Sequence, residues 1–175
     1  MEIEEFVKKS EGKWLSMRSG HSLAFQQFEE IVSNIEISLL QRNDPKIESL
    51  IHDNELKKNT YIKPFIIKWN AETNWEGKIQ NSNGNSIIIP FPKSKKDGFM
   101  IRSSGYAENI KVVTDYQFTD DGTLLLSTNY TETTANERIW FISENVRCRS
   151  SVLLSSKSKA ILQTSFASEI RKLKS

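Results

Sequence analysis

The segment ERIWFISENVRCRSS, residues 137–151, joins two runs of β-forming residues that also carry charged side chains. Alternate residues of a strand lie on opposite faces, so the second run puts Val146 and Cys148 on one face and Arg147 and Arg149 on the other. By alternation alone, a solvated outer face is the simpler interpretation for the two arginines. A polar wall that receives an anionic ligand is the alternative.

Similar β-forming segments extend through most of the chain. Ten short segments rich in β-branched and aromatic residues follow one another, and Asn, Gly, Asp or Pro separates most of them. The dipeptides Asn83-Gly84 and Asp121-Gly122 are typical of hairpin turns. Ten sequential strands with no repeat and no linker predict one all-β domain over residues 1–175. Its antiparallel sheet is expected to close into a barrel that holds one ligand in the lumen.

Two segments have helical rather than strand periodicity. Residues 1–10 predict a short amphipathic helix with Ile3, Phe6 and Val7 on one side. Residues 44–54, DPKIESLIHDN, begin with a capping aspartate and a proline suited to a first helical turn. We therefore expect one short N-terminal helix and one helix inserted between strands.

Composition limits the classes of protein that remain. The chain has 175 residues, of which 37% are hydrophobic and 26% charged, as in a globular domain. Its net charge of +2 is close to balance, so nucleic acid is not an expected partner. The N-terminal MEIEEFVKKS does not resemble a signal peptide, and no apolar run reaches the length of a membrane span. We expect a soluble cytoplasmic protein without a membrane partner.

Neither a metal centre nor a catalytic nucleophile is expected. Cys148 is the single cysteine, which excludes an internal disulfide, and His21 and His52 do not have zinc-ligand spacing. The chain contains no Gly-x-Ser-x-Gly, phosphate-binding loop or dinucleotide motif. We expect His21 to be a hydrogen-bonded strand residue, and Cys148 and Trp140 to pack in the core.

Ligand binding is better supported. Trp69 and Trp75 flank AETN, which we expect to be a turn, and tryptophan at a cavity mouth can stack on a flat conjugated ligand. An arginine pairs two-pronged with a carboxylate, and Glu137 could accept hydrogen bonds from ligand N–H groups. An open-chain tetrapyrrole has both kinds of group. On these residues alone it is one ligand among several.

The order of six motifs resembles that of the S-type phycobiliprotein lyases. They are GKWLSMRSGHSLAF, IKWNAETNW, SGYAEN, DDGTLLLSTNY, NERIWFISENVRCRSS and SFASEIR, and they extend over residues 12–171. The resemblance implies a ten-stranded antiparallel barrel of the calycin type, related in shape to lipocalins and fatty-acid-binding proteins. It also implies that a free phycobilin binds and is attached through a thioether to a cysteine of a phycobiliprotein subunit.

The resemblance further implies which residues touch the bilin. They are Arg18, Trp69, Trp75, Glu137, Arg147, Arg149 and Ser151. It implies that Glu137 and Arg147 are catalytic residues. It also implies that the face with Arg147 and Arg149 points into the lumen, whereas Arg138 is expected to face solvent. The bilin, expected to be phycoerythrobilin, is substrate, so no cofactor or metal is expected. The expected partners are the bilin and an apo-phycobiliprotein subunit, with a homodimer left open.

Some features depart from the family pattern. The family usually has Arg-Thr-Ser-His-His where this chain has RSGHS from Arg18, and Glu144 replaces a proline, which predicts a looser turn before the arginines. Two alternatives stay open: a non-catalytic bilin carrier, and a fatty-acid-type barrel in which Glu137 would repel the ligand carboxylate. The expected setting is cyanobacterial cytosol, plastid stroma or a phage-infected cell.

Overall fold

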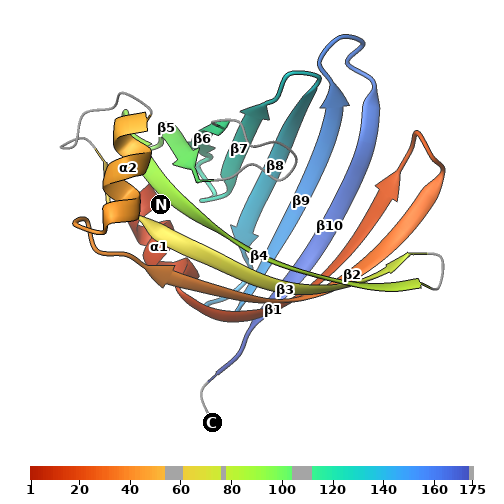
Figure 1. The fold of residues 1–175 in the computed structure, drawn as a ribbon, viewed down its shortest axis with the longest axis horizontal. Helices are drawn as coiled ribbons and strands as arrows, with labels where there is room; N and C mark the ends of the chain where they lie inside the picture. The colour runs from red at the N-terminus through yellow and green to blue at the C-terminus, as the bar shows by residue number, and fades with distance from the viewer. Residues whose placement is uncertain (54–60, 76–77, 104–111, 174–175) are drawn as a thin grey trace.

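The computed structural model describes residues 1–53, 61–75, 78–103 and 112–173, and within them ten strands form one closed antiparallel barrel (Figure 1). Each strand pairs with its neighbours in sequence, and the first strand pairs with the last. The strands are β1 (Gly12–Ser22), β2 (Gln27–Leu39), β3 (Phe65–Trp75), β4 (Lys78–Pro92), β5 (Asp97–Arg102), β6 (Val112–Phe118), β7 (Leu124–Asn129), β8 (Thr133–Phe141), β9 (Val146–Ser155) and β10 (Ile161–Arg171). The predicted fold class is confirmed.

Helix α1 (Ile3–Ser10) closes one end of the barrel. Its apolar side, Ile3, Phe6 and Val7, belongs to a buried cluster with inward-facing residues of most strands. The ring of Phe6 lies 5.8 Å from that of Phe118, and the indole nitrogen of Trp14 donates a hydrogen bond to the Ser10 carbonyl at 2.9 Å. The helix predicted over residues 1–10 is therefore confirmed, and it fills the lumen at this end.

Helix α2 (Pro45–Asp53) packs on the outside of the barrel. Ile47 and Ile51 are fully buried against Ile87, Ile89 and Phe91, which point outward from β4. Both faces of β4 are therefore covered at this point. A strand covered on both faces carries apolar residues on both, so its sequence is uninterruptedly apolar here rather than alternating. The helix predicted over residues 44–54 is confirmed.

One of the two predicted hairpin turns is wrong. Asp121-Gly122 does form a turn, in which the Gly122 amide donates to the Thr119 carbonyl at 3.0 Å. Asn83-Gly84 instead lies inside β4, where Gly84 is paired with Trp69 of β3. A Cβ on Gly84 would lie 2.5 Å from the Trp69 ring, so this glycine provides room for an indole rather than a turn.

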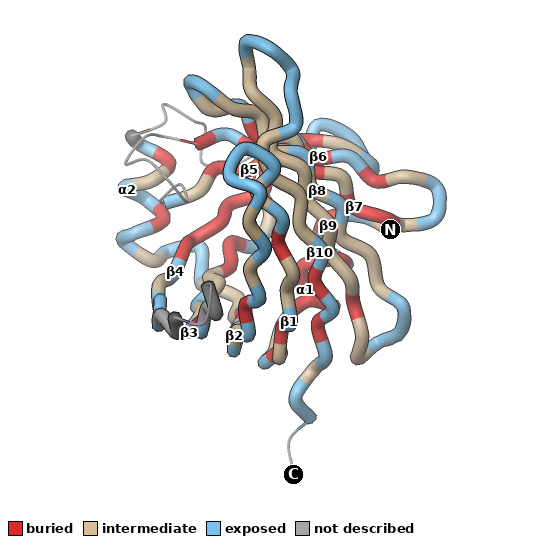
Figure 2. The backbone as a smooth tube through the Cα atoms, turned by 90° about the vertical axis from the view of Figure 1, so that its right-hand side faces the viewer, coloured by how far each residue is buried: buried red, intermediate tan, exposed pale blue. Residues whose placement is uncertain are grey.

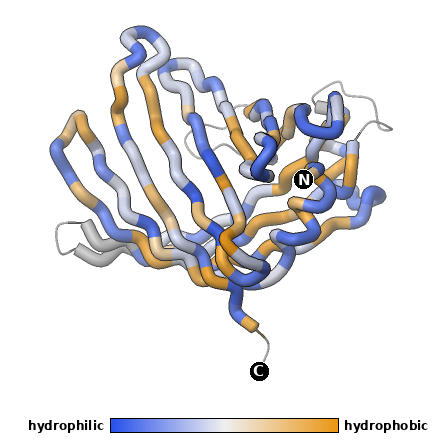
Figure 3. The backbone as a smooth tube through the Cα atoms, turned by 180° about the vertical axis from the view of Figure 1, so that it is seen from behind, coloured by the Kyte–Doolittle hydropathy of each residue, from blue (hydrophilic) through white to orange (hydrophobic). Residues whose placement is uncertain are grey.

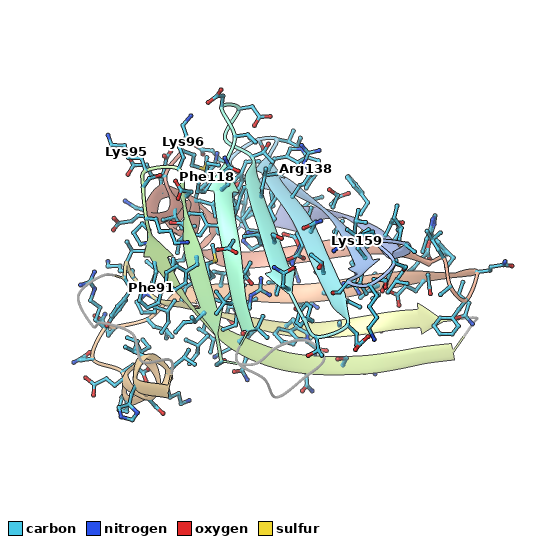
Figure 4. All side chains as sticks on the ribbon, turned by 90° about the horizontal axis from the view of Figure 1, so that it is seen from above. Phe91, Lys95, Lys96, Phe118, Arg138 and Lys159 are labelled. Atoms are coloured by element: carbon cyan, nitrogen blue, oxygen red, sulfur yellow. The ribbon has the colours of Figure 1, made fainter. Side chains whose placement is uncertain are left out.

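The segment AETN is likewise strand and not turn, because it belongs to β3. A turn in PFPKSKKDG joins β4 to β5, and Lys95 and Lys96 lie exposed in it (Figure 4).

The expected core positions of Trp140 and Cys148 are also wrong. Both lie on the outer face, where they are paired in register between β8 and β9, and the Trp140 ring contacts that of Phe166 at 6.1 Å. The inward positions are the alternate residues Glu137, Ile139 and Phe141 on β8. Ile139 is paired with Arg149 of β9. Hydropathy alternates along the strands (Figure 3), so a shift by one residue exchanges the two faces.

His21 lies on the outer face of β1, exposed, with its ring 5.0 Å from that of Phe28. In the ranges that the structure describes, no helix is long and apolar enough to cross a membrane.

Candidate functional site

The lumen has a filled end and an unfilled end. In β6 buried and exposed residues alternate strictly, and its inward Tyr116 and Phe118 belong to the buried cluster that includes α1. In β9 nearly every residue is only partly buried, including the inward-facing ones (Figure 2). Inward residues that keep partial exposure border a space that the chain itself does not fill. A ligand cavity is therefore expected on this side of the barrel.

A carboxylate shared by two arginines lies in this unfilled part. The Arg149 Nε donates to Glu137 Oε1 at 3.1 Å, and its Nη2 donates to the same oxygen. From β5, the Arg102 Nη2 lies 3.8 Å from Glu137 Oε2. Burial by itself raises the pKa of Glu137, but the charges of Arg149 and Arg102, with that of Arg18, outweigh it, so its pKa lies below the ordinary value. Glu137 is thus an ionised carboxylate in a low-dielectric site.

A second ion pair lies on the β1–β2 wall. The Arg18 Nη2 is 3.6 Å from Glu29 Oε1, which also accepts a hydrogen bond from Gln163 at 3.3 Å. Gly20 leaves room for this carboxylate, because a Cβ there would lie 2.8 Å from Glu29 Oε1. The hydroxyls of Ser151 and Ser165 form a hydrogen bond of 2.7 Å on the neighbouring strands.

The predicted site residues can now be placed. Four of them face the lumen from its polar wall: Arg18, Glu137, Arg149 and Ser151. Trp69 faces it from β3 across Gly84. Trp75 ends β3, but its side chain is outside the described residues. Arg138 is exposed on the outer face, as predicted (Figure 4).

Arg147 also faces inward, but it lies in the filled end. Its guanidinium is paired with the Glu169 carboxylate, and its Cζ lies 4.5 Å from the centre of the Trp14 ring. Arg147 is 6% exposed and Glu169 is 2% exposed. Burial lowers the pKa of Arg147, while Glu169 raises it. The role of Arg147 in contacting the ligand stays a prediction, and in this structure its charge is already neutralised.

The turn before these arginines is tied to the rest of the chain. The Glu144 carbonyl accepts hydrogen bonds from Arg171 Nη2 at 3.2 Å and Nε at 3.3 Å, and Arg171 also donates to the carbonyl of Lys9 at 2.6 Å. The position where a looser turn was predicted is thus connected to the end of α1.

Sequence reasoning missed two charged residues of the lumen, Arg102 and Glu29. Both lie at inward positions of strands, Arg102 two residues after the buried Met100 and Glu29 two residues before Ile31. The alternation was visible in the sequence, but only the closed barrel brings Arg102 of β5 to Glu137 of β8.

A separate hollow of about 720 Å³ extends along β5 to β8. Most of its lining residues alternate away from the lumen, including Asp115, Gln117 and Arg138. It therefore lies mainly on the outer surface, although Glu137 of the charged site is also among the residues that border it.

A closed ten-stranded antiparallel barrel with one helix-plugged end and a charged lumen defines a ligand-binding barrel of the calycin class. The model of the CpeS-like protein family matches residues 2–172, so the chain belongs to this family. The resemblance found in the sequence is confirmed.

Relatives and a solved structure agree with this family. A relative from Trichodesmium erythraeum named "Chromophore lyase CpcS/CpeS 3" is 39% identical over 98% of this chain and 99% of its own length. One from Microchaete diplosiphon named "Putative phycoerythrobilin lyase CpeS" is 36% identical over 85% of this chain and 66% of its own. The S-type phycobiliprotein lyase CPES from Guillardia theta has a TM-score of 0.87 at 26% identity, covering 100% of this chain and 95% of the other. These similarities confirm the prediction of an enzyme of the lyase class.

Proposed function

We propose that this chain binds a free phycobilin in the lumen and promotes its thioether attachment to a cysteine of an apo-phycobiliprotein subunit. The observation that carries the proposal is the ionised Glu137, held inside an unfilled lumen by two arginines. A bilin has N–H groups for such a carboxylate and propionates for such arginines. The names of the relatives support the same activity, and one of them supports phycoerythrobilin as the bilin.

Each residue has a defined part in this proposal. Arg149 and Arg18 bind propionate groups, and the Ser151 hydroxyl lies beside them. Glu137 accepts hydrogen bonds from the pyrrole N–H groups, which favours the protonated chromophore. Trp69 covers one ring face. Arg147 is paired with Glu169 and lies two residues from Arg149 on the same face of β9. In this proposal it contributes to catalysis indirectly, by fixing the position of Arg149.

The chemical step uses a nucleophile from the client. Its cysteine thiolate adds to the ethylidene carbon of the A ring, the carbon–carbon double bond supplies the electron pair that takes up a proton, and a carbon–sulfur bond forms. The barrel acts by positioning, because it holds a flexible bilin in one orientation toward the incoming thiol. The chain's own Cys148 faces outward, away from the lumen.

The direct test is the visible spectrum of the purified protein mixed with phycoerythrobilin. A sharpened, red-shifted band is expected, and it should weaken in Glu137→Gln and Arg149→Gln because each removes half of the ion pair. Arg138→Gln is the matched control, since this arginine is exposed on the same strand as Glu137. An unchanged bilin spectrum with the parent protein would contradict the proposal.

A non-catalytic bilin carrier would have the same lumen. Incubation of the bilin-loaded protein with an apo-phycobiliprotein subunit separates the two functions, because a lyase gives faster and more selective thioether formation than free bilin. A fatty-acid barrel is disfavoured by Glu137, because a fatty acid has no N–H group to offset the repulsion between this carboxylate and its own near Arg149. Competition by a fatty acid against bilin would favour that alternative.

A further inference from the structure

We propose that Arg102 is a specificity-determining residue that binds the second carboxylate of the ligand. This inference extends the proposed function, because it adds to the charged site a residue from β5, a strand that contributes none of the other site residues. Arg102 ends β5, where it is paired in register with Ile88 of β4 and Val112 of β6. Its guanidinium lies near Glu137 of β8, although β6 and β7 separate the two strands in the barrel.

The guanidinium of Arg102 has donors that the described residues do not use. Its Nε is buried and has no hydrogen-bond partner there, and its Nη2 is 3.8 Å from Glu137, which is longer than a hydrogen bond. A buried polar group without a partner costs stability and is rare in native proteins. Burial lowers the pKa of Arg102, while Glu137 raises it.

The two arginines on Glu137 differ in how they bind it. Arg149 presents its Nε and Nη2 to one carboxylate oxygen. Arg102 has the same Nε–Nη2 edge, but among the residues that the structure describes no carboxylate lies within hydrogen-bond distance of it. That edge matches the two oxygens of a carboxylate in a bidentate pair. One carboxylate therefore serves both cations, and Arg102 is the one left with an unfilled edge.

A ligand with two carboxylates fits this arrangement better than a ligand with one. One carboxylate binds on the β1 and β9 side, at Arg18 and Arg149, and the other binds the free edge of Arg102. When Arg102 turns to the ligand, Glu137 Oε2 becomes available for a ligand N–H. Ligand binding thus exchanges a weak ion pair for a bidentate one, and selects dicarboxylates.

The test compares phycoerythrobilin with its dimethyl ester in the parent protein and in three variants. Arg102→Gln removes the charge, Arg102→Lys keeps the charge but loses the planar fork, and Arg138→Gln is an exposed-arginine control. Dissociation constants come from titrations of the visible band, and thermal unfolding of each variant without ligand reports its fold.

For the free acid, Arg102→Gln is expected to weaken binding about tenfold or more, and Arg102→Lys by a smaller factor. For the dimethyl ester, all four proteins should bind with constants within about threefold of one another, because the ester cannot form the ion pair. A purely structural role of Arg102 would weaken acid and ester alike, which would overturn the inference. Should Arg102→Gln fail to fold, the same acid-to-ester comparison in Arg102→Lys decides.

The outcomes separate this inference from the proposed function. Binding of phycoerythrobilin by the parent with unchanged affinity in both Arg102 variants overturns the role of Arg102 alone. Absence of binding by the parent overturns the proposed function and the role of Arg102 with it. Loss for the acid but not for the ester supports both.

Discussion

Two arginines on the same face of β9, two residues apart, each pair with a glutamate. The two pairs have the same composition but differ in burial and in surroundings. Arg147 and Glu169 are buried, and the Arg147 guanidinium lies over the ring of Trp14, which packs in the cluster that includes α1. Arg149 and Glu137 lie beside the unfilled lumen, where the Arg149 side chain is 37% exposed. The first pair has no room for another partner, and the second can exchange its partner for a ligand. Burial, and not residue type, therefore separates a structural ion pair from a binding site.

The largest expected effect is at the sealed pair. Replacing Arg147 with Ala should lower the free energy of unfolding by about 3–5 kcal/mol, because Glu169 would be left as a buried charge without its partner. Urea denaturation measures it, with Arg138→Ala as the exposed control, expected to change the value by less than about 0.5 kcal/mol.

A double replacement sharpens this result. Arg147→Leu combined with Glu169→Leu should recover most of the stability, since no unpaired charge stays buried. An equal loss of unfolding free energy in the single and double variants would show that the unpaired charge of Glu169 is not the cause of the destabilisation.

At the exchangeable pair, Glu137→Gln should lower the free energy of unfolding at neutral pH by about 1.5–3 kcal/mol, since two arginines lose a charged acceptor. The folded-state pKa of Glu137 is lowered, so its contribution is complete above the unfolded pKa of about 4.3 and is lost as pH falls through the lower folded value. Stability measured from pH 7 downward should therefore fall less in the variant than in the parent.

The control for this pH dependence is Glu132→Gln, which removes an exposed pair with Lys157. It should change stability by less than about 1 kcal/mol. Parallel pH profiles for the parent and Glu137→Gln would contradict an ionised, arginine-bound Glu137.

A smaller effect is expected at the aromatic wall of the lumen. Gly84→Ala puts a Cβ against the Trp69 ring and should cost about 1–3 kcal/mol through displacement of the indole. Tryptophan fluorescence should shift, and the bilin band should weaken if Trp69 covers the ligand. Asn85→Ala, the exposed neighbour on the same strand, should leave both signals unchanged. Unchanged fluorescence in Gly84→Ala would contradict the predicted displacement of the Trp69 indole.

The smallest effect is expected outside the lumen. Cys148→Ser should change stability by less than about 0.5 kcal/mol and leave bilin transfer unchanged, because the thiol is on the outer face. Burial raises the pKa of Cys148, with Glu169 adding to the effect, so its reaction with a thiol reagent at neutral pH should be slower than that of a free cysteine. Loss of transfer in Cys148→Ser would overturn the assignment of the nucleophile to the client.

Sequence reasoning succeeded where a property depends on neighbours along the chain. The two helices have their own periodicity, and the ten strands have local β-forming composition with turn residues between them. It failed where a local signal competes with a distant contact. Asn83-Gly84 has the composition of a turn, but the indole of Trp69 on the paired strand occupies the space above the glycine.

The candidate site divides in the same way. Residue order alone predicts that Arg147 and Arg149 share a face, that the fold is all-β, and which motifs resemble a lyase family. The closed barrel is what turns this face inward, buries Arg147 with Glu169, and brings Arg102 of β5 near Glu137 of β8. The reason is physical: alternation specifies which residues share a face, whereas burial and partner depend on strands that closure brings together.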